Sequence, residues 1–382
     1  MMITYGKQTI DKEDIKAVVK SLKEPLITQG KYVEKFEKNL CSYFGSKYAS
    51  VFSSGTAALH TIGNILNWKK NDIIITTPIT FVATANSAIY SGSNISIVDI
   101  NLNNYSINID SLYKKIKFLL NKNKKISAII VVDYAGHPSD WKILKKIASK
   151  FKITLINDNC HALGAKYFKR KDYAIQYADF VIHSYHPVKN ITTGEGGAIL
   201  SNSKKYDKKA KIFRNHGIIR GNLNSNNLWE YEIKNIGYNY RITDFQCALG
   251  ISQLKKLSKF VLKKQRIAKI YNESFNKFNF IKIPSISNDI EHSYHLYVIL
   301  IDFKKLRISK GLFFKKMLKK GIKLQVHYIP LYRLDFFKKK FNYSDFKNSE
   351  YFYKNAVSLP IYPSLSKVDQ KYVIDNLLNE LK

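Results

Sequence analysis

Cysteine patterns that would form disulfides or bind metal are missing from this sequence. It has 3 cysteines in 382 residues, Cys41, Cys160 and Cys247. Their odd number and their spacing fit neither pairing nor metal ligation, so we expect reduced thiols and no metal site. Long apolar runs are missing too, since no stretch approaches the roughly 18 uncharged apolar residues of a membrane span and the first residues lack an apolar signal core. We therefore expect a cytoplasmic protein without a membrane partner.

Acidic residues are scarce relative to basic ones. Lys and Arg number 63 against 29 Asp and Glu, which gives a formal net charge of +34. Such an excess raises nucleic acid as a partner, but the lysines are scattered in pairs and triplets and no arm, repeat or known motif gathers them. A compositional bias explains the charge more simply than a specific nucleic-acid partner. A Walker loop and an early GxGxxG are also missing, so the usual nucleotide-binding fingerprints are excluded.

What the sequence does contain is the pattern of an α/β protein. The apolar content of 45% allows a large core. Residues 11–23 and 32–44 have the apolar spacing of amphipathic helices. From residue 48, short apolar runs alternate with helical segments, as in a mostly parallel sheet covered by helices. The expected strands are 49–52, 73–76, 95–98, 128–133, 153–157, 180–184 and 198–201.

After residue 257 the pattern changes to longer lysine-rich helices with a few strands, expected at 297–300 and 323–327. We therefore predict a large α/β domain over residues 11–255 and a small α+β domain over residues 256–382. A helix at 243–264 is expected to join them.

In open α/β sheets the ligand lies outside the carboxyl ends of the strands, and several segments there carry residues with useful chemistry. Residues 53–59 (SSGTAAL) follow a strand and open a helix, where hydroxyls and free N–H groups favour a phosphate; an ordinary helix cap has the same appearance. Phe81 follows the next strand, and it either stacks on a flat aromatic cofactor or belongs to the core.

Residues 158–164 (DNCHALG) and 184–197 (SYHPVKNITTGEGG) also follow strands. Asp158 is either a structural cap or the counter-ion of a heterocyclic cation, and His161 either contacts the same ring or is a structural histidine. Most lysines are solvated surface charges, but Lys189 is isolated between two apolar runs and can act as an amine nucleophile toward a carbonyl. A phosphate site, an aromatic ring, an aspartate and a buried lysine are together the needs of pyridoxal phosphate.

These segments, together with residues 237–246 (GYNYRITDFQ), resemble the DegT/DnrJ/EryC1/StrS family of nucleotide-sugar aminotransferases over nearly the whole chain. The resemblance implies fold type I, the fold of aspartate aminotransferase, and a homodimer whose active sites are shared between subunits. It implies that Lys189 forms a Schiff base with pyridoxal phosphate and moves protons. The other implied cofactor contacts are Asp158 to the ring nitrogen, Phe81 and His161 to the ring, Gly55, Thr56 and Ser184 to the phosphate, and Asn239 to the phosphate of the neighbouring subunit.

Four further segments are 26–30 (LITQG), 133–136 (DYAG), 325–330 (QVHYIP) and 358–360 (SLP). They are similar to the branch that transfers the amino group of L-glutamate to C4 of a UDP-linked 4-keto-6-deoxy-N-acetylhexosamine in pseudaminic acid biosynthesis. The resemblance places residues 1–10 near the cleft and implies sugar contacts by Tyr5, His327 and Tyr328. Two alternatives stay open: amination of C3 or C4 of another nucleotide-linked keto sugar, and a cofactor-binding regulator or an inactive sugar binder on the same fold. One departure is Asn157, where many relatives carry an acidic residue.

Overall fold

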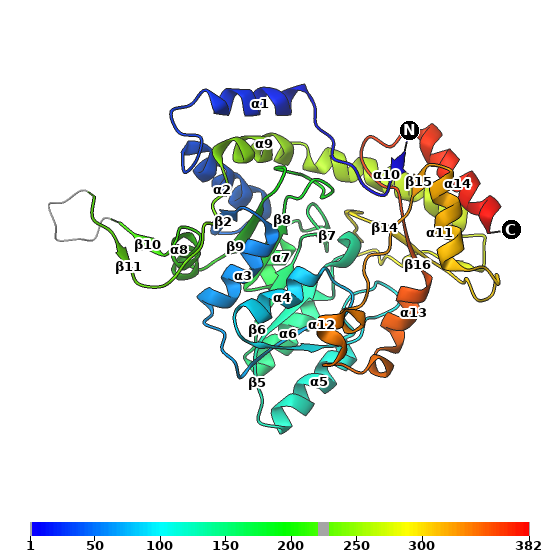
Figure 1. Cartoon of the computed structure of the whole chain (residues 1–382), viewed down its shortest axis with the longest axis horizontal. Coiled ribbons are helices and arrows are strands. Elements are labelled where there is room, and N and C mark those ends of the chain that lie inside the picture. Colours follow the sequence, from blue (N-terminus) through cyan, green and yellow to red (C-terminus); the bar gives the residue numbers. More distant parts are fainter. Residues whose placement is uncertain (1, 221–228, 382) are drawn as a thin grey trace.

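The computed structural model describes residues 2–220 and 229–381, and its centre is a seven-stranded mixed sheet (Figure 1). The strand order is β2-β9-β8-β6-β5-β3-β4; β9 runs antiparallel to β2 and β8, and the other neighbouring pairs are parallel. All the strands expected before residue 202 are confirmed: β2 (Tyr48–Phe52), β3 (Asp72–Thr76), β4 (Asn94–Ile97), β5 (Lys125–Val132), β6 (Thr154–Asp158), β8 (Phe180–Ser184) and β9 (Gly197–Ser201).

Helices cover both faces of this sheet, because successive side chains of a strand point to opposite faces. Val51 of β2 packs in one core and the adjacent Phe52 packs in the other. The first core is covered by α2 (Lys31–Phe44), α5 (Ile109–Asn121), α6 (Trp141–Phe151), α7 (Tyr173–Tyr177) and α9 (Asp244–Leu254). The second is covered by α3 (Gly55–Ile65), α4 (Val82–Tyr90) and α8 (Lys204–Phe213).

The two helices expected at the start of the chain are also confirmed. Helix α1 (Lys12–Leu22) begins at a capping box formed by Asp11 and Asp14 and packs on α9. Helix α2 ends at Gly45, whose φ of 75° is a left-handed conformation that glycine adopts without strain.

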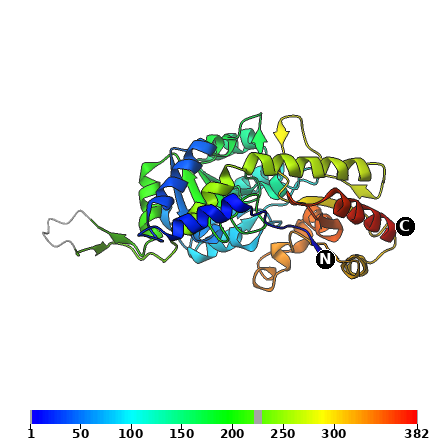
Figure 2. The ribbon, with the colours of Figure 1, turned by 90° about the horizontal axis from the view of Figure 1, so that it is seen from above.

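The C-terminal helices and strands gather at one end of the molecule (Figure 2). Their buried side chains form a further core. Its sheet has the order β12-β14-β16 and is covered by long helices. Ile3 joins this core because β1 (Ile3–Thr4) pairs with β15 (Ile322–Lys323). The other elements are α10 (Leu257–Phe275), β12 (Ile281–Lys282), β14 (Tyr297–Ile301), α11 (Lys310–Lys319), α13 (Lys347–Asn355), β16 (Ala356–Leu359) and α14 (Lys367–Glu380). The domain division after residue 255 stays a prediction.

Two expected elements differ from the structure. The helix expected at 243–264 is two helices, α9 and α10, which meet at a turn that lets Leu254 and Leu257 both enter the core of the large sheet. The strand expected at 323–327 shrinks to β15, because the chain leaves the ladder there and carries His327 and Tyr328 into a cavity. The strand expected at 297–300 is present as β14.

The remaining elements are short. The pair β10 (Ile218–Ile219) and β11 (Glu232–Ile233) lies away from the body of the molecule (Figure 1). The others are β7 (Lys166–Tyr167), β13 (Ile290–Glu291), α12 (Asp335–Lys338) and 3-10 turns at Tyr134–Gly136, Leu331–Arg333 and Tyr343–Asp345. Over residues 2–220 and 229–381 the structure holds no helix whose length and apolar character would let it span a membrane.

Candidate active site

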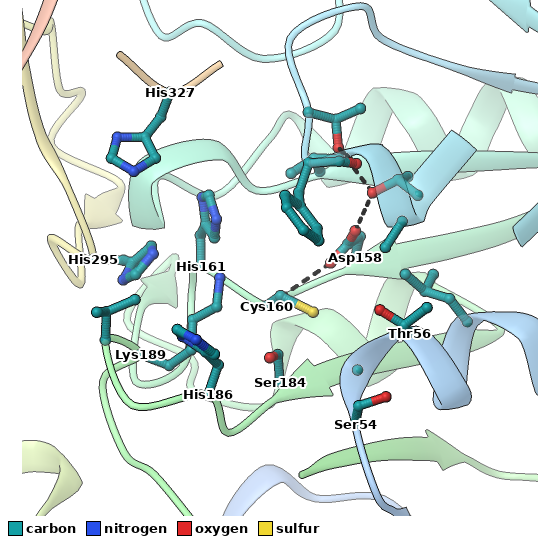
Figure 3. A pocket seen from close by; sticks show the side chains of 18 of the residues that line it. Ser54, Thr56, Asp158, Cys160, His161, Ser184, His186, Lys189, His295 and His327 are labelled. Carbon is teal, nitrogen blue, oxygen red and sulfur yellow. Dashed lines mark hydrogen bonds between the residues drawn. The ribbon is translucent and has the colours of Figure 1, made fainter. Parts of the chain in front are cut away.

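A cavity of about 510 Å³ lies at the carboxyl ends of β6 and β8, beside the N-termini of α3 and α4 (Figure 3). Nearly all the site residues named from the sequence line it, although they come from distant parts of the chain. They are Tyr5, Gly55, Thr56, Phe81, Asp158, His161, Ser184, Lys189, His327 and Tyr328. Asn239 does not line this cavity; it is exposed and forms a β-bridge with Asn215.

The N-terminus of α3 forms one end of the cavity. Ser54 caps the helix by accepting a hydrogen bond from the Ala57 N–H at 3.0 Å, and the N–H groups of Gly55 and Thr56 have no acceptor within the helix. A Cβ added to Gly55 would lie 2.9 Å from the Cβ of Ser184, so the helix end packs directly on the end of β8. Free N–H groups, hydroxyls and the positive end of the helix dipole make this a site for a phosphate.

Asp158 ends β6 at the floor of the cavity, and its side chain is 4% exposed. The hydroxyl of Thr84 donates to Oδ2 at 2.7 Å, and the N–H of Cys160 donates to Oδ1 at 3.3 Å. Thr84 is itself 2.8 Å from the hydroxyl of Thr80. Each carboxylate oxygen keeps a further lone pair for a ligand, so the carboxylate is fixed in place and still able to accept a proton donor.

A second buried carboxylate, Asp133, explains the two asparagines that flank Asp158. The side chains of Asn157 and Asn159 both donate to Asp133 Oδ2, at 3.1 and 3.2 Å. The other donors to Asp133 are Ser139 N–H, Trp141 Nε1 and Tyr173 Oη. Burial raises the pKa of Asp133 to about 6, although these hydrogen bonds oppose the shift. Asn157 thus pairs with a neighbouring acid and supports the strand end that carries Asp158.

His161 and Tyr328 form a wall of the cavity. The N–H of Ala135 donates to His161 Nδ1 at 3.2 Å, so the proton of the neutral ring lies on Nε2, which is 3.0 Å from the Tyr328 hydroxyl. Burial, followed by the nearby Lys189, lowers the pKa of His161 well below its usual value. The Phe81 ring lies 5.8 Å from that of Tyr328 and is 54% exposed, so it is available to a ligand and is not a core residue.

Lys189 lies in the loop between β8 and β9, and its amine points toward His161 (Figure 3). The loop is fixed by hydrogen bonds to the carbonyl of Tyr185 from the Thr193 N–H at 3.0 Å and from the Thr192 hydroxyl at 2.8 Å. Burial lowers the pKa of the Lys189 amine, while Cys160 and Asp158 oppose the shift. A lysine in this setting is more easily deprotonated than a surface lysine and can act as a nucleophile or a base.

A known family model covers most of the chain. It matches residues 8–378 and describes the DegT/DnrJ/EryC1/StrS aminotransferase family. The chain belongs to the DegT/DnrJ/EryC1/StrS aminotransferase family. It is therefore a pyridoxal phosphate-dependent sugar aminotransferase with the fold of its structural neighbours, and the predictions of fold type I, enzyme class and cofactor are confirmed.

Relatives of this aminotransferase match it over their full length. The UDP-4-amino-4,6-dideoxy-N-acetyl-beta-L-altrosamine transaminase of Campylobacter jejuni strain 81-176 is 41% identical, covering 100% of this chain and 98% of the relative. The solved structure of Helicobacter pylori PseC, an aminotransferase involved in the biosynthesis of pseudoaminic acid, is 34% identical with a TM-score of 0.91, covering 100% and 99% of the two chains. The PLP-form of the sugar aminotransferase Spr1654 of Streptococcus pneumoniae is 26% identical with a TM-score of 0.91, covering 100% and 99%.

The geometry of this aminotransferase fits pyridoxal phosphate. The α3 N-terminus suits the phosphate, Asp158 suits a protonated ring nitrogen, and Lys189 supplies the amine. No arrangement of His, Cys, Asp and Glu in the described part of the chain is suited to a metal ion.

Sequence reasoning missed Thr84 and His295, which also line the cavity. No local pattern indicates the role of Thr84, because that role depends on a hydrogen bond to Asp158, which is 74 residues away in the sequence. The Nδ1 atom of His295 is buried and has no hydrogen-bond partner among the described residues, and its ring lies 4.3 Å from that of His161. A histidine just before the expected strand at 297–300 was the available signal. His327, predicted from its motif, is held by Ser358 at 2.9 Å, and burial lowers its pKa to about 3.

Proposed function

We propose that this enzyme transfers the amino group of L-glutamate to C4 of a UDP-linked 4-keto-6-deoxy-N-acetylhexosamine. The product is UDP-4-amino-4,6-dideoxy-N-acetyl-β-L-altrosamine, an intermediate of pseudaminic acid biosynthesis. The observation that carries this proposal is the full-length similarity to transaminases named for that product, at 41% identity for the Campylobacter jejuni protein and 37% for the Helicobacter pylori protein. The cavity supplies the groups that the reaction needs.

Several residues bind and orient the cofactor in this proposal. The N–H groups of Gly55 and Thr56 and the hydroxyl of Ser184 hold the phosphate. Asp158, fixed by Thr84, keeps the ring nitrogen protonated because a buried carboxylate favours a cation beside it. Pyridoxal phosphate, when bound, supplies an electron sink for the transfer of an amino group.

Phe81 and His161 flank the ring in this proposal. The exposed ring of Phe81 offers a surface for stacking. His161 is fixed by the Ala135 N–H on one side and Tyr328 on the other, so it presents a neutral, immobile ring to the cavity. A neutral imidazole does not compete with the ring nitrogen for Asp158.

Lys189 is the proposed catalytic residue. It binds the cofactor covalently between turnovers, and its freed Nζ takes the α-proton of glutamate and later delivers a proton to C4 of the sugar. The lowered pKa of the buried amine favours the neutral form that accepts a proton. A single amine thus serves as anchor, base and acid.

The sugar nucleotide is proposed to lie at the mouth of the cavity. Tyr5 and His327 pack there with their rings 4.7 Å apart, and Tyr328 lies beside them. Tyr5 comes from the N-terminal segment, and His327 and Tyr328 come from the loop after β15. The N-terminal segment and the C-terminal part of the chain therefore both contribute to the mouth of the cavity. A tyrosine hydroxyl and a neutral imidazole suit the hydroxyls of a sugar.

A homodimer with shared active sites completes the proposal. Asn239 is exposed and does not reach its own cavity. In the sequence just before it, Trp229 is 76% exposed and Ile236 is 81% exposed, and exposed apolar side chains of this kind suit an interface. A two-fold symmetric dimer lets Asn239 of each subunit reach the other's phosphate site.

Mixing two inactive variants tests the shared site. Lys189→Ala subunits mixed with Asn239→Ala subunits should recover about a quarter of the wild-type activity, because half the dimers are mixed and each contains one intact site. No recovery, with mixed dimers shown by mass spectrometry, would place both residues in one subunit's site.

We also propose a cytoplasmic location, supported by the three free cysteines, which cell fractionation tests.

The substrate is tested by offering a panel of nucleotide-linked 4-keto and 3-keto sugars with L-glutamate and identifying the amino sugar formed. We expect amination of C4 of the UDP-linked 4-keto-6-deoxy-N-acetylhexosamine. Reaction with a different keto sugar would support the aminotransferase reaction and contradict the proposed sugar substrate. The purified enzyme should also be coloured by its lysine-bound cofactor, and Lys189→Ala should abolish that band. A wild-type protein that takes up no pyridoxal phosphate would contradict the assignment altogether.

A further inference from the structure

His295 is a buried histidine of the cavity lining that has no role in the mechanism above. It is 4% exposed, and its ring lies 4.3 Å from the ring of His161. Its Nδ1 atom is fully buried without a hydrogen-bond partner among the described residues. Its Nε2 atom has no such partner either, but it is not fully buried. The ring therefore has one nitrogen left to offer to a ligand in the cavity.

The backbone on both sides of His295 is fixed to the cavity wall. The N–H of Ser293 donates to the carbonyl of Gly136 at 3.0 Å. The N–H of Leu296 donates to the carbonyl of Ala135 at 3.1 Å. Because both neighbours are anchored, the buried imidazole is held in place at the edge of the cavity.

The unpartnered Nδ1 decides where the proton of the His295 ring lies. Burial lowers the pKa of His295 well below its usual value, and His161 and Lys189 lower it further, so the ring is neutral. A proton on Nδ1 would leave a buried donor without an acceptor, which is rarer in proteins than an unfilled acceptor. The proton therefore lies on Nε2, and His295 presents a hydrogen-bond donor to the cavity.

The other buried histidines of the described lining already have partners. His161 donates to the hydroxyl of Tyr328 at 3.0 Å, and His327 shares a hydrogen bond of 2.9 Å with Ser358. No arginine among the described residues lines the cavity, although arginine is the side chain best suited to bind a carboxylate. His295 is therefore the buried imidazole that is available to an acceptor group of a ligand.

An anionic acceptor suits this side of the cavity. The Lys189 amine points toward His161, beside the His295 ring (Figure 3). Behind it, Lys264 is 2% exposed and donates to Asn190 Oδ1 at 2.8 Å. Buried basic groups favour an anion close to them.

The cofactor phosphate is not this anion. Figure 3 shows His295 on the opposite side of the cavity from Ser54 and Thr56, at the phosphate-binding end of α3. The proposed reaction brings a second anion to the Lys189 amine, because the α-carboxylate of glutamate is on the same carbon as the amino group and the proton that Lys189 removes.

We propose that His295 binds the α-carboxylate of the amino donor through its Nε2–H. This inference rests on the proposed function, in which L-glutamate is the donor, and it deepens that function by assigning a residue to the donor. By holding the carboxylate, His295 fixes one substituent of the α-carbon while Lys189 takes the proton from it.

The test uses the holoenzyme and two ligands that cannot be converted, because neither has a hydrogen on the carbon that bears the amino group. L-Isovaline keeps the α-carboxylate of glutamate and lacks its side-chain carboxylate. 4-Amino-4-methylpentanoate keeps the side-chain carboxylate and has a methyl group in place of the α-carboxylate. The dissociation constant of each ligand is measured by calorimetry.

His295→Leu should weaken the binding of L-isovaline about tenfold or more, because it removes a hydrogen bond to a charged group. The binding of 4-amino-4-methylpentanoate and of pyridoxal phosphate should not change. His295→Gln places an amide N–H near the position of Nε2 and should retain most of the affinity for L-isovaline. His295→Asn carries the same amide on a shorter side chain and should lose that affinity, so this pair decides if His295→Leu does not fold.

His183 provides a matched control. It is another fully buried histidine with a ring nitrogen that has no partner among the described residues, and it lies outside the cavity lining. His183→Leu should leave both dissociation constants unchanged. A purely structural role of His295 would lower the melting temperature of His295→Leu without any difference between the two ligands.

Three results would overturn the proposal: a wild-type enzyme that does not bind L-isovaline, an unchanged affinity for L-isovaline in the folded variants, or an equal loss of both ligands. Weaker binding of the sugar nucleotide alone would assign His295 to the sugar and would also overturn it. The two ligands need no sugar. Failure of the substrate panel with intact, His295-dependent binding of L-isovaline would therefore contradict the proposed function and not this inference.

Discussion

Gly55, the first residue of α3, is a position where one added methyl group should disturb the phosphate site. A Cβ at Gly55 would lie 2.9 Å from Ser184 Cβ, 3.3 Å from Ser184 Oγ and 3.4 Å from the carbonyl oxygen of His183. Relief requires the helix to move away from β8, and such overpacking costs about 1–3 kcal/mol. Replacing glycine by alanine in a helix returns about 0.5–1 kcal/mol. Gly55→Ala should therefore lower the free energy of unfolding by up to about 2.5 kcal/mol and weaken cofactor binding.

Gly311 in the first turn of α11 is the matched control, because the nearest atom to its added Cβ would be Ser309 Oγ at 3.8 Å. Gly311→Ala should stabilise the protein by up to about 1 kcal/mol. The assay is thermal unfolding of both variants, in which 1 kcal/mol shifts Tm by about 2–4 °C for 150–250 residues. Pyridoxal phosphate affinity is measured by titration, and it should fall only for Gly55→Ala.

A double-mutant cycle shows whether the contact with Ser184 is the cause. Ser184→Gly removes the two atoms closest to the added Cβ, so that the nearest remaining atom is the His183 carbonyl oxygen at 3.4 Å. Adding Gly55→Ala in that background should cost less than in the wild type by about 1 kcal/mol or more. Additive effects, or a Gly55→Ala protein as stable as Gly311→Ala, would refute the proposed packing of α3 on β8.

Three further predictions test the support of the site. Thr84→Val removes a 2.7 Å hydrogen bond to Asp158 and should raise the dissociation constant of pyridoxal phosphate about tenfold or more, since bonds to charged groups contribute about 1.5–3 kcal/mol; an unchanged affinity would contradict this. Asp133→Asn should lower Tm by several degrees, because the new amide NH2 is a donor that would face the donor groups of Asn157 and Asn159. An unchanged Tm would show that the network is dispensable. Urea midpoints should fall between pH 7.5 and 5, because burial lowers the pKa of His183 and of His327 to about 3 and the unfolded chain then binds more protons. Each of these two histidines should lower the free energy of unfolding by about 2 kcal/mol when the pH falls to 5. Asp133, whose pKa is raised to about 6, should increase the free energy of unfolding by about 1 kcal/mol over the same change. A flat profile would contradict the neutral burial of these histidines.

Local patterns were sufficient for the large sheet. Apart from the edge strand β4, which is partly exposed, its strands are short runs that are largely buried on both faces. The residues at the carboxyl ends of the strands include Asp158 and the loop of Lys189. Patterns failed where a long-range contact decides the structure. The segment at 323–327 alternates polar and apolar residues as a strand does. His327 nevertheless bonds to Ser358 and Tyr328 to His161, which draws the chain out of the ladder.

The supporting residues were also out of reach of local patterns. From the sequence, Thr84 cannot be distinguished from other threonines near it. Only the structure shows that its hydroxyl donates a hydrogen bond to Asp158. Lys264 reads as one of many lysines on an amphipathic helix, and only packing shows that its amine is buried against Asn190. In a chain with 63 basic residues, composition cannot separate such a lysine from the exposed ones.

Two strand-end carboxylates show how the structure separates a structural acid from a ligand-binding one. Asp133 follows β5 and Asp158 ends the adjacent β6, and both are buried. A carboxylate has about four acceptor sites. Donors from five residues converge on Asp133 and leave no capacity for a ligand, whereas Asp158 receives one donor on each oxygen and faces the cavity. The asparagines that fill Asp133 flank Asp158, so saturation of the first acid fixes the backbone that presents the second. The unfilled lone pairs of Asp158 are therefore a property of the fold, held ready for a protonated ring nitrogen.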